Sequence, residues 1–191
     1  PTLYNALIVH PGAERRDLSS LRLCISAAET LSQEMFAEWE RCHGLRIVEG
    51  LGSTEVLHIY ISNGLERQKP GASGARVPGY EIKLCDPEGH TVRVGEPGIM
   101  WVRGDSNAPF YWNRPDKTRE TMREGWIYTG DRFREDTDGY YWFEGRADDL
   151  VKVSGQWVHP MEVERALAEH PAVRECAVLA VEDENRLMTL R

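Results

Sequence analysis

The sequence predicts an α/β fold that continues into an antiparallel β subdomain and then into a small α+β unit, and three changes of pattern support this. The first stretch places a helical pattern between two apolar strands. The middle stretch consists of short alternating strands and turns, and the last reads as a hairpin, a helix and a strand. We therefore expect the end of a parallel-sheet α/β core over residues 1–75, a β-barrel-like subdomain over 76–145, and a hinge with the truncated start of a mobile C-terminal domain over 146–191.

The first strand–helix–strand unit is predicted to be parallel. Residues 21–27 (LRLCISA) and 45–50 (LRIVEG) are strand-like, and the segment between them carries apolar residues at helical spacing. Ser32 suits the start of this helix and Gly44 its end. A short connection of this kind joins neighbouring parallel strands, so the Ser-Ala-Ala-Glu and Gly-Ser-Thr-Glu segments should meet at the carboxyl edge of the sheet, where ligands bind.

The middle stretch carries turn signals between its strands. Residues 80–84 and 98–104 alternate apolar and polar side chains on either side of an Asp-Pro-Glu-Gly-His turn. Asp138-Gly139 is a hairpin signal. We expect core packing rather than ligand stacking for four tryptophans, Trp101, Trp112, Trp126 and Trp142.

The last stretch contains a predicted hairpin at Ser154-Gly155 and a helix with Pro160 in its first turn. Residues 175–181 (ECAVLAV) are strand-like, and we expect the partners of this strand to lie outside the chain. The chain begins without Met and stops soon after this strand. We interpret both ends as cuts through a longer protein.

Composition excludes several classes of protein. Hydrophobic residues make up 41% of the chain, which excludes a disordered protein. Lys and Arg number 23 against 31 Asp and Glu, a net charge of −8, which argues against broad binding to nucleic acid or to a membrane surface. No apolar run approaches the roughly 20 residues of a membrane-spanning helix. The four cysteines lie far apart without metal-ligand spacing, so we expect a reduced, cytoplasmic protein.

Gly-Ser-Thr-Glu at residues 52–55 is the first candidate binding motif. Glycine lets backbone amides approach an anion, the Thr54 hydroxyl can donate to a phosphate, and the Glu55 carboxylate suits Mg²⁺. Taken alone, the motif is more often a strand-to-loop turn in which polar side chains cap backbone groups.

Two further motifs carry charged side chains. Tyr-Thr-Gly-Asp ends in Asp131, whose carboxylate could accept from the paired hydroxyls of a ribose or could simply stabilise a turn. The stretch from Gly145 onward is either an exposed charged linker or a hinge between two units. Its charged residues are Arg146, Asp148, Asp149 and Lys152.

Together these motifs resemble a known superfamily. SAAE, GSTE, YWNRPDKT, YTGD and GRADDLVKVSGQWVHPMEVE occur in the order and approximate spacing of the acyl-adenylate-forming enzymes, which include acyl-CoA synthetases, peptide-synthetase adenylation domains and luciferases. The segment GLGSTEVLHIYISN is most similar to benzoate- and aryl-CoA ligases. The resemblance covers nearly the whole chain.

The resemblance implies an ATP-dependent carboxylate–CoA ligase for a benzoate-like acid, with ATP, Mg²⁺ and coenzyme A as cofactors and a small carboxylate as partner. The carboxylate would attack the α-phosphate of ATP, giving acyl-AMP and pyrophosphate, and the CoA thiol would then displace AMP. Thr54 would contact the α-phosphate and Glu55 would ligate Mg²⁺. The other implied nucleotide and CoA contacts are Ala28, Glu29, Leu51, Gly52, Ser53, Asp131, Arg146, Lys152 and Gly155.

Two more roles follow from the resemblance. Asp148 would be the hinge about which the small domain swings between half-reactions. His58 would line the acyl pocket or its entrance, although a satisfied histidine near a sheet edge explains it as well. Leu51 replaces an aromatic residue of many members, so stacking on adenine should weaken.

The family's upstream phosphate loop and its late lysine are not among these 191 residues, so we expect the chain alone not to catalyse adenylation. Two alternatives to a CoA ligase stay open. One is an adenylation domain that loads a carrier protein, and the other is a catalytically silent nucleotide-binding or interaction module.

Overall fold

The computed structural model describes residues 1–28, 31, 33–69, 71–153, 156–168, 170, 172–173, 176–182 and 188–191. Its helices are α1 (Thr2–Val9), η1 (Ala13–Arg15), α2 (Gln33–His43), α3 (Pro115–Thr121) and α4 (Pro160–Ala168). Its strands are β1 (Cys24–Ala27), β2 (Ile47–Gly52), β3 (Ile59–Ser62), β4 (Gly74–Arg76), β5 (Glu81–Cys85), β6 (Pro97–Arg103), β7 (Met122–Arg123), β8 (Trp126–Glu135), β9 (Tyr140–Arg146), β10 (Val151–Val153), β11 (Gln156–Val158), β12 (Ala180–Glu182) and β13 (Met188–Leu190). The predicted mixed α/β fold class is confirmed.

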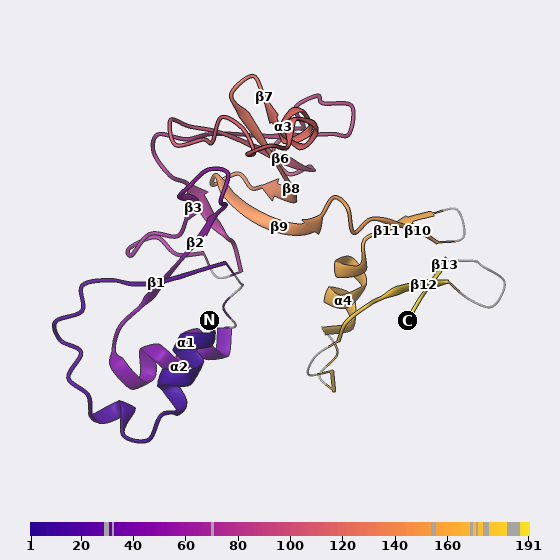
Figure 1. Cartoon of the computed structure of the whole chain (residues 1–191). Coiled ribbons are helices and arrows are strands. Elements are labelled where there is room, and N and C mark those ends of the chain that lie inside the picture. The colour runs from indigo at the N-terminus through magenta and orange to yellow at the C-terminus, as the bar shows by residue number, and fades with distance from the viewer. Residues whose placement is uncertain are drawn as a thin grey trace.

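One large sheet runs through most of the molecule (Figure 1). Within the described residues its strand order is β1-β2-β3-β4-β9-β8-β6-β5, with β7 added beside β8. Among the described strands of this sheet, β1 and β2 alone are parallel, and the other pairs are antiparallel. The expected boundary at residues 75 and 76 lies inside β4, so the first and middle stretches share one hydrogen-bonded sheet.

The parallel pair forms as its sequence predicts. Cys24 pairs with Ile47 and Ala27 with Gly50, so the ends of β1 and β2 lie side by side. Gly44 adopts φ +66° directly after α2, and its N–H donates to the Glu40 carbonyl at 2.7 Å. This left-handed position explains why glycine ends the helix. The expected helix cap, Ser32, lies outside the described residues.

Two clusters of buried side chains stabilise the fold. The smaller one packs α2 against the parallel pair, and its buried members are Cys24, Leu31, Trp39 and Ile47. The larger one fills the antiparallel region, and its buried members are Val56, Tyr60, Ile61, Leu84, Met100, Val102, Ile127, Phe133 and Tyr141. Because the segment after β2 contributes Val56 to the larger cluster, the Gly-Ser-Thr-Glu motif is anchored between the two parts of the sheet.

The four middle tryptophans do not occupy the core, which corrects the expectation stated above. Trp112 is 87% exposed, and the other three are only partly buried. Trp126 lies beneath the Lys83 ammonium and the Arg103 guanidinium, at 4.4 and 4.6 Å from its ring centroid. Trp101 and Trp142 also lie under cationic side chains, so the three tryptophans on strands are covered at least in part by Lys and Arg.

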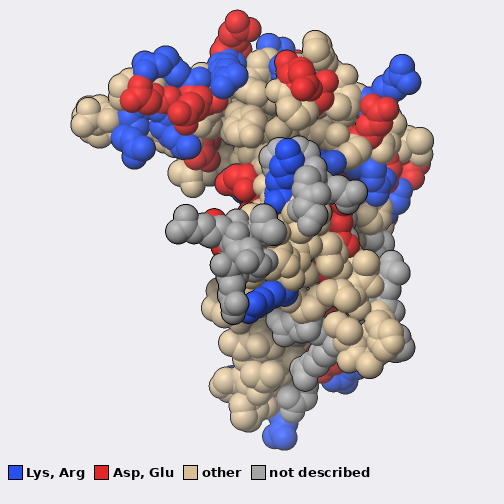
Figure 2. Space-filling model, turned by 90° about the vertical axis from the view of Figure 1, so that its right-hand side faces the viewer, with Lys and Arg blue, Asp and Glu red and all other residues tan. Residues whose placement is uncertain are grey.

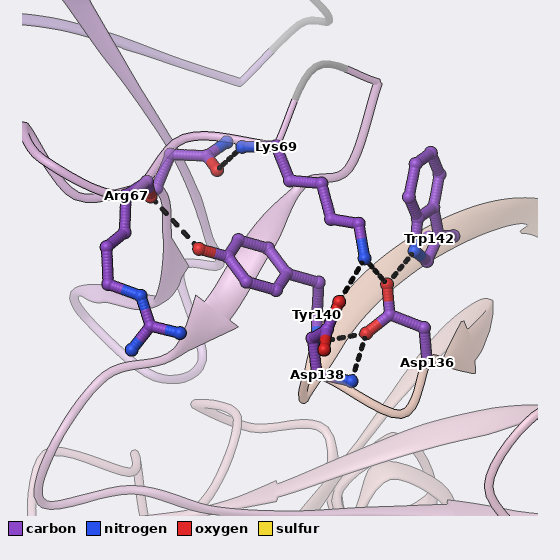
Figure 3. A network of polar contacts seen from close by, with 7 residues as sticks. Arg67, Lys69, Asp136, Asp138, Tyr140 and Trp142 are labelled. Atoms are coloured by element: carbon purple, nitrogen blue, oxygen red, sulfur yellow. Dashed lines mark hydrogen bonds and ion pairs between the residues drawn. The ribbon is translucent and has the colours of Figure 1, made fainter.

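A polar network ties the loop between β3 and β4 to the turn between β8 and β9 (Figure 3). The Lys69 ammonium donates to Asp136 at 2.6 Å and to Asp138 at 2.8 Å. The indole N–H of Trp142 donates to the same Asp136 oxygen at 2.8 Å. The network therefore fixes the distal end of the β8–β9 hairpin, whose turn at Asp138-Gly139 is the predicted one.

The C-terminal part forms two small hairpins beside α4. β10 pairs with β11 as predicted, although Ser154 and Gly155 themselves lie outside the described residues. α4 begins at Pro160, and its Glu162 approaches Arg132 of β8 at 3.6 Å. The expectation that the last strand has no partner is wrong, because β12 pairs with β13 of the same chain.

The surface carries mixed charge. Figure 2 shows Lys and Arg side chains beside Asp and Glu over the upper part of one face. Among the residues that the structure describes, no helix has both the length and the apolar character needed to cross a membrane.

Candidate functional site

A cavity of about 290 Å³ opens between the segment after β2, the start of α3 and the strands β8 and β9. It gathers side chains from motifs that are far apart in the sequence. Its lining includes Ser53, Glu55, Asp131 and Arg146, together with Tyr111. The cavity volume lies near the lower end for small-molecule sites, so it suits part of a nucleotide rather than a whole one.

Glu55 is held from its backbone and from its side chain. The Ala108 N–H donates to the Glu55 carbonyl at 2.7 Å, and the Tyr111 hydroxyl donates to Glu55 Oε1 at 2.5 Å. Burial alone would raise the pKa of Glu55, but the hydrogen bond from Tyr111 and further local hydrogen bonds outweigh it, and the pKa lies below its ordinary value. The Glu55 carboxylate is therefore an anion at neutral pH.

Asp131 and Arg146 form the opposite wall. They are paired residues of β8 and β9, and Arg146 Nη1 donates to Asp131 Oδ1 at 3.1 Å. Burial raises the pKa of Asp131, and Arg146 only partly offsets this. Gly130 has φ +74°, and a side chain there would bring Cβ within 3.0 Å of the Arg146 guanidinium. The glycine of the Tyr-Thr-Gly-Asp motif therefore makes room for the arginine.

Arg146 also reaches the predicted hinge. Its Nε and Nη2 donate to the two oxygens of Asp148 at 3.0 and 3.3 Å. This forked geometry lowers the pKa of Asp148. Asp148 lies in the turn between β9 and β10, where the chain leaves the large sheet.

The glycine of the Gly-Ser-Thr-Glu motif is needed for backbone packing, whether or not a ligand is bound. β2 and β3 come close together at Gly52, where a Cβ atom would lie 2.5 Å from the His58 carbonyl oxygen. Gly52 is therefore required for the close approach of the two strands. Ser53 follows with a buried hydroxyl that makes no hydrogen bond of ordinary geometry to a described residue, although it lies close to Glu55.

Thr54, His58, Leu51 and Ala28 are among the predicted residues that lie outside the cavity lining. Thr54 and His58 are exposed, and His58 Nδ1 contacts the carbonyl of Ile59 at 3.2 Å. Leu51 packs against the larger core cluster. Ala28 is exposed at the end of β1 with φ +74°.

The remaining predicted residues belong to other parts of the chain. Lys152 is exposed on β10. Glu29 and Gly155 lie outside the described residues.

Two residues of the YWNRPDKT motif line the cavity, although the sequence gives neither a role. They are Tyr111 and Lys117. The presence of this motif in the resemblance is the only signal that could have drawn attention to them. Their position depends on α3 folding back toward Glu55, a contact between residues 56 positions apart.

The donor set fits a metal that is shared with a ligand. In the described part of the chain no group of three or more His, Cys, Asp or Glu side chains could hold an ion by itself. Mg²⁺ is usually bound through one or two carboxylates together with substrate phosphates and water. Glu55 supplies one such carboxylate at the cavity wall. The residues present therefore suit a Mg²⁺ ion whose other ligands come from nucleotide phosphates and water.

Comparison with known families settles which group this chain joins. The family described as "AMP-binding enzyme" matches residues 1–112, more than half of the chain. The chain belongs to the AMP-binding enzyme family. The match includes the SAAE and GSTE motifs.

Several aryl-CoA ligases are similar to this chain. Benzoate–CoA ligase of Thauera aromatica is 41% identical over 189 residues, which cover 98% of this chain and 36% of that protein. The crystal structure of the anthranilate CoA ligase AuaEII in complex with anthranoyl-AMP superposes with a TM-score of 0.82 at 46% identity, covering all of this chain and 37% of that one. A benzoate CoA ligase from Burkholderia xenovorans gives a TM-score of 0.82 at 40% identity, with coverages of 100% and 38%. The chain thus spans little more than a third of the relatives it matches.

Proposed function

We propose that the protein to which this chain belongs is an ATP-dependent ligase that joins a benzoate-like aromatic acid to coenzyme A. Family membership supports the nucleotide chemistry, and similarity to benzoate- and anthranilate-CoA ligases supports the aromatic acid. The observation that carries the proposal is the cavity that brings Glu55, Asp131 and Arg146 together from three separate motifs.

The reaction would proceed in two balanced steps. A carboxylate oxygen of the acid attacks the α-phosphorus of ATP, and pyrophosphate leaves. The sulfur of CoA then attacks the acyl carbonyl, and AMP leaves as the thioester forms. Mg²⁺ would neutralise charge on the phosphates during the first step.

The residues of the cavity wall would bind the nucleotide at defined atoms. Asp131 would accept from the ribose hydroxyls while Arg146 holds the carboxylate in place and donates from its remaining N–H groups. Glu55 would contribute one oxygen to Mg²⁺. Thr54 would donate to the α-phosphate after a change in the exposed segment that carries it.

The remaining residues would serve the rest of the nucleotide, the acid and CoA. We assign Ala28, Glu29, Leu51, Gly52 and Ser53 to the nucleotide, His58 to the acid, and Lys152 and Gly155 to the CoA side. Asp148 would be the hinge, and its forked contact with Arg146 would couple the position of the C-terminal unit to the ribose site. We assign residues 1–75 to the end of a large core, 76–145 to a β subdomain and 146–191 to the start of a mobile unit. We also propose that the whole protein is cytoplasmic.

Thioester formation tests the proposal. The whole protein, ATP, Mg²⁺ and CoA would be incubated with benzoate, 2-aminobenzoate, hydroxybenzoates and aliphatic acids of similar size, and products would be identified by mass spectrometry. An aryl-CoA product is expected. Acyl-AMP that accumulates without thioester would instead favour a carrier-protein acceptor, and no adenylate from any acid would favour a silent nucleotide-binding module.

A further inference from the structure

The segment between β6 and α3, residues 104–114, forms hydrogen bonds with the backbone of Glu55 and Val56. The Ala108 N–H donates to the Glu55 carbonyl at 2.7 Å, and the Ser106 hydroxyl donates to the Val56 carbonyl at 2.6 Å. Ser106 in turn lies 2.9 Å from the Tyr80 hydroxyl. Two successive peptide groups after β2 are thus fixed by the same segment, which also places Tyr111 over the Glu55 side chain.

The Tyr111 hydroxyl determines how the Glu55 carboxylate is turned. It donates to Oε1 at 2.5 Å, the short distance expected for an O–H donor on an ionised oxygen. The last torsion of a glutamate is otherwise broad and roughly two-fold. With Oε1 engaged by the phenol, rotation of the carboxylate is restricted, and Oε2 is the oxygen that the phenol leaves available to a cation.

Tyr111 is itself held in place. Its backbone N–H donates to Thr118 Oγ1 at 2.9 Å, and the Thr118 hydroxyl donates to the Arg114 carbonyl at 2.9 Å. Tyr111 lines the cavity from the segment that precedes α3. Hydrogen bonds to the Tyr111 backbone therefore restrict where the phenol can lie relative to Glu55. Groups that orient metal ligands are commonly held by hydrogen bonds in this way.

We propose that Tyr111 is a positioning residue for Glu55, and that its hydroxyl sets the affinity of the site for the Mg²⁺ that enters with ATP. This inference rests on the proposed function. It adds a residue that would act on the metal through the Glu55 carboxylate and would not ligate the ion itself. Loss of such an outer partner typically weakens metal affinity about 10- to 100-fold.

The test is the Mg²⁺ dependence of nucleotide binding by the whole protein. Binding of a non-hydrolysable ATP analogue is measured by calorimetry at graded Mg²⁺ concentrations and again in EDTA. Tyr111→Phe is expected to raise the half-saturating Mg²⁺ concentration about 10-fold or more, while metal-free binding stays close to wild type. Tyr140→Phe, which removes a remote tyrosine hydrogen bond to the Arg67 carbonyl, is the matched control and should change neither value.

Two further variants separate positioning from a general structural role. In a Glu55→Gln background, Tyr111→Phe should produce no additional change, because both substitutions act on one ligand. If Tyr111→Phe lowers the yield of folded protein, Thr118→Val loosens the support of Tyr111 without altering its ring and should shift the Mg²⁺ requirement in the same direction.

The outcomes distinguish failure of the Tyr111 inference from failure of the proposed ligase function. A wild-type protein that needs Mg²⁺ for nucleotide binding, with an unchanged requirement in Tyr111→Phe, would overturn this inference and leave the proposed function standing. An equal loss of metal-free binding in Tyr111→Phe would also overturn it. A wild-type protein whose nucleotide binding ignores Mg²⁺ would contradict the proposed function and this inference with it.

Discussion

Asp131 and Arg146 face each other as paired residues of β8 and β9, with their charged groups 3.1 Å apart. The same guanidinium holds both oxygens of Asp148 in the turn that leads to the C-terminal unit. One arginine therefore connects the proposed ribose site to the proposed hinge. Because the hairpin turn is fixed at its distal end by the Lys69 network, this pair lies on a supported element.

Asp131→Asn is expected to weaken ATP binding by the whole protein about 10- to 100-fold. A hydrogen bond to an ionised group contributes roughly 1.5–3 kcal/mol, and each 1.4 kcal/mol corresponds to about tenfold in affinity. The control is 2′-deoxy-ATP together with 3′-deoxy-ATP. Wild type should bind both more weakly than ATP, and the variant should discriminate less. Equal discrimination by the variant would mean that Asp131 does not contact the ribose.

The same substitution should raise thermal stability at neutral pH. Burial raises the pKa of Asp131 above its ordinary 3.8, so the fold accommodates the protonated carboxyl better than the anion. That contribution is fully present below pH 3.8 and is lost as the pH rises through the raised pKa. Asparagine stays neutral throughout, so the Tm of Asp131→Asn should exceed that of wild type at pH 7. The difference in Tm between Asp131→Asn and wild type, measured at several pH values, should become smaller from pH 7 toward pH 4. A variant with a lower Tm than wild type at pH 7 would contradict this prediction.

Asp136→Asn is expected to lower the free energy of unfolding at pH 7 by about 1–3 kcal/mol. Burial opposes ionisation of Asp136, but hydrogen bonds from Lys69, Trp142 and the turn backbone outweigh it and hold its pKa well below 3.8. The stabilisation is present above pH 3.8 and is lost as the pH falls below it. Urea unfolding at several pH values measures both effects.

Asp138→Asn is the matched control for this network. The Asp138 side chain is 64% exposed against 14% for Asp136, and both contact Lys69. An exposed ion pair contributes little, so the control should differ from wild type by less than about 1 kcal/mol. Equal decreases in the free energy of unfolding of Asp136→Asn and Asp138→Asn would show that the burial of Asp136 does not determine its contribution to stability.

Gly52→Ala should damage both stability and nucleotide binding. The new Cβ would meet the His58 backbone at 2.5 Å, so β2 and β3 must separate at the point that positions Glu55. Such overpacking costs about 1–3 kcal/mol. Gly64→Ala is the control, since its nearest neighbours would lie 3.7 Å away. Unfolding and ATP titrations of both variants check the prediction, and a Gly52→Ala protein like wild type would contradict the close-approach explanation.

Local pattern predicted most of the elements. The helix before Gly44, the parallel pair around it, the hairpin at Asp138-Gly139 and the helix at Pro160 all follow from side-chain period and turn chemistry, which act over a few residues. The pairing of β4 with β9 does not, because it joins segments more than 60 residues apart. That pairing joins the first and middle stretches of the chain in one sheet.

The candidate site was predictable where motifs carry charged groups. Glu55, Asp131 and Arg146 were named from three motifs, and all three line one cavity. The sequence assigns no role to Tyr111, because its importance comes from a contact with a residue 56 positions away and not from its neighbours in sequence. The outer tryptophans were placed in the core because a ring covered by Lys83 and Arg103 has the same strand pattern as a buried one.

The most direct test of the central proposal is ATP–pyrophosphate exchange by the whole protein, measured with aromatic and aliphatic carboxylates beside the Glu55→Ala variant. Exchange that requires an aromatic acid, and that falls at least about 100-fold in the variant, is the predicted result, because removal of a single preorganised charge-stabilising group costs about that much. A folded protein that binds ATP but exchanges pyrophosphate with none of the acids, or a variant as active as wild type, would contradict it.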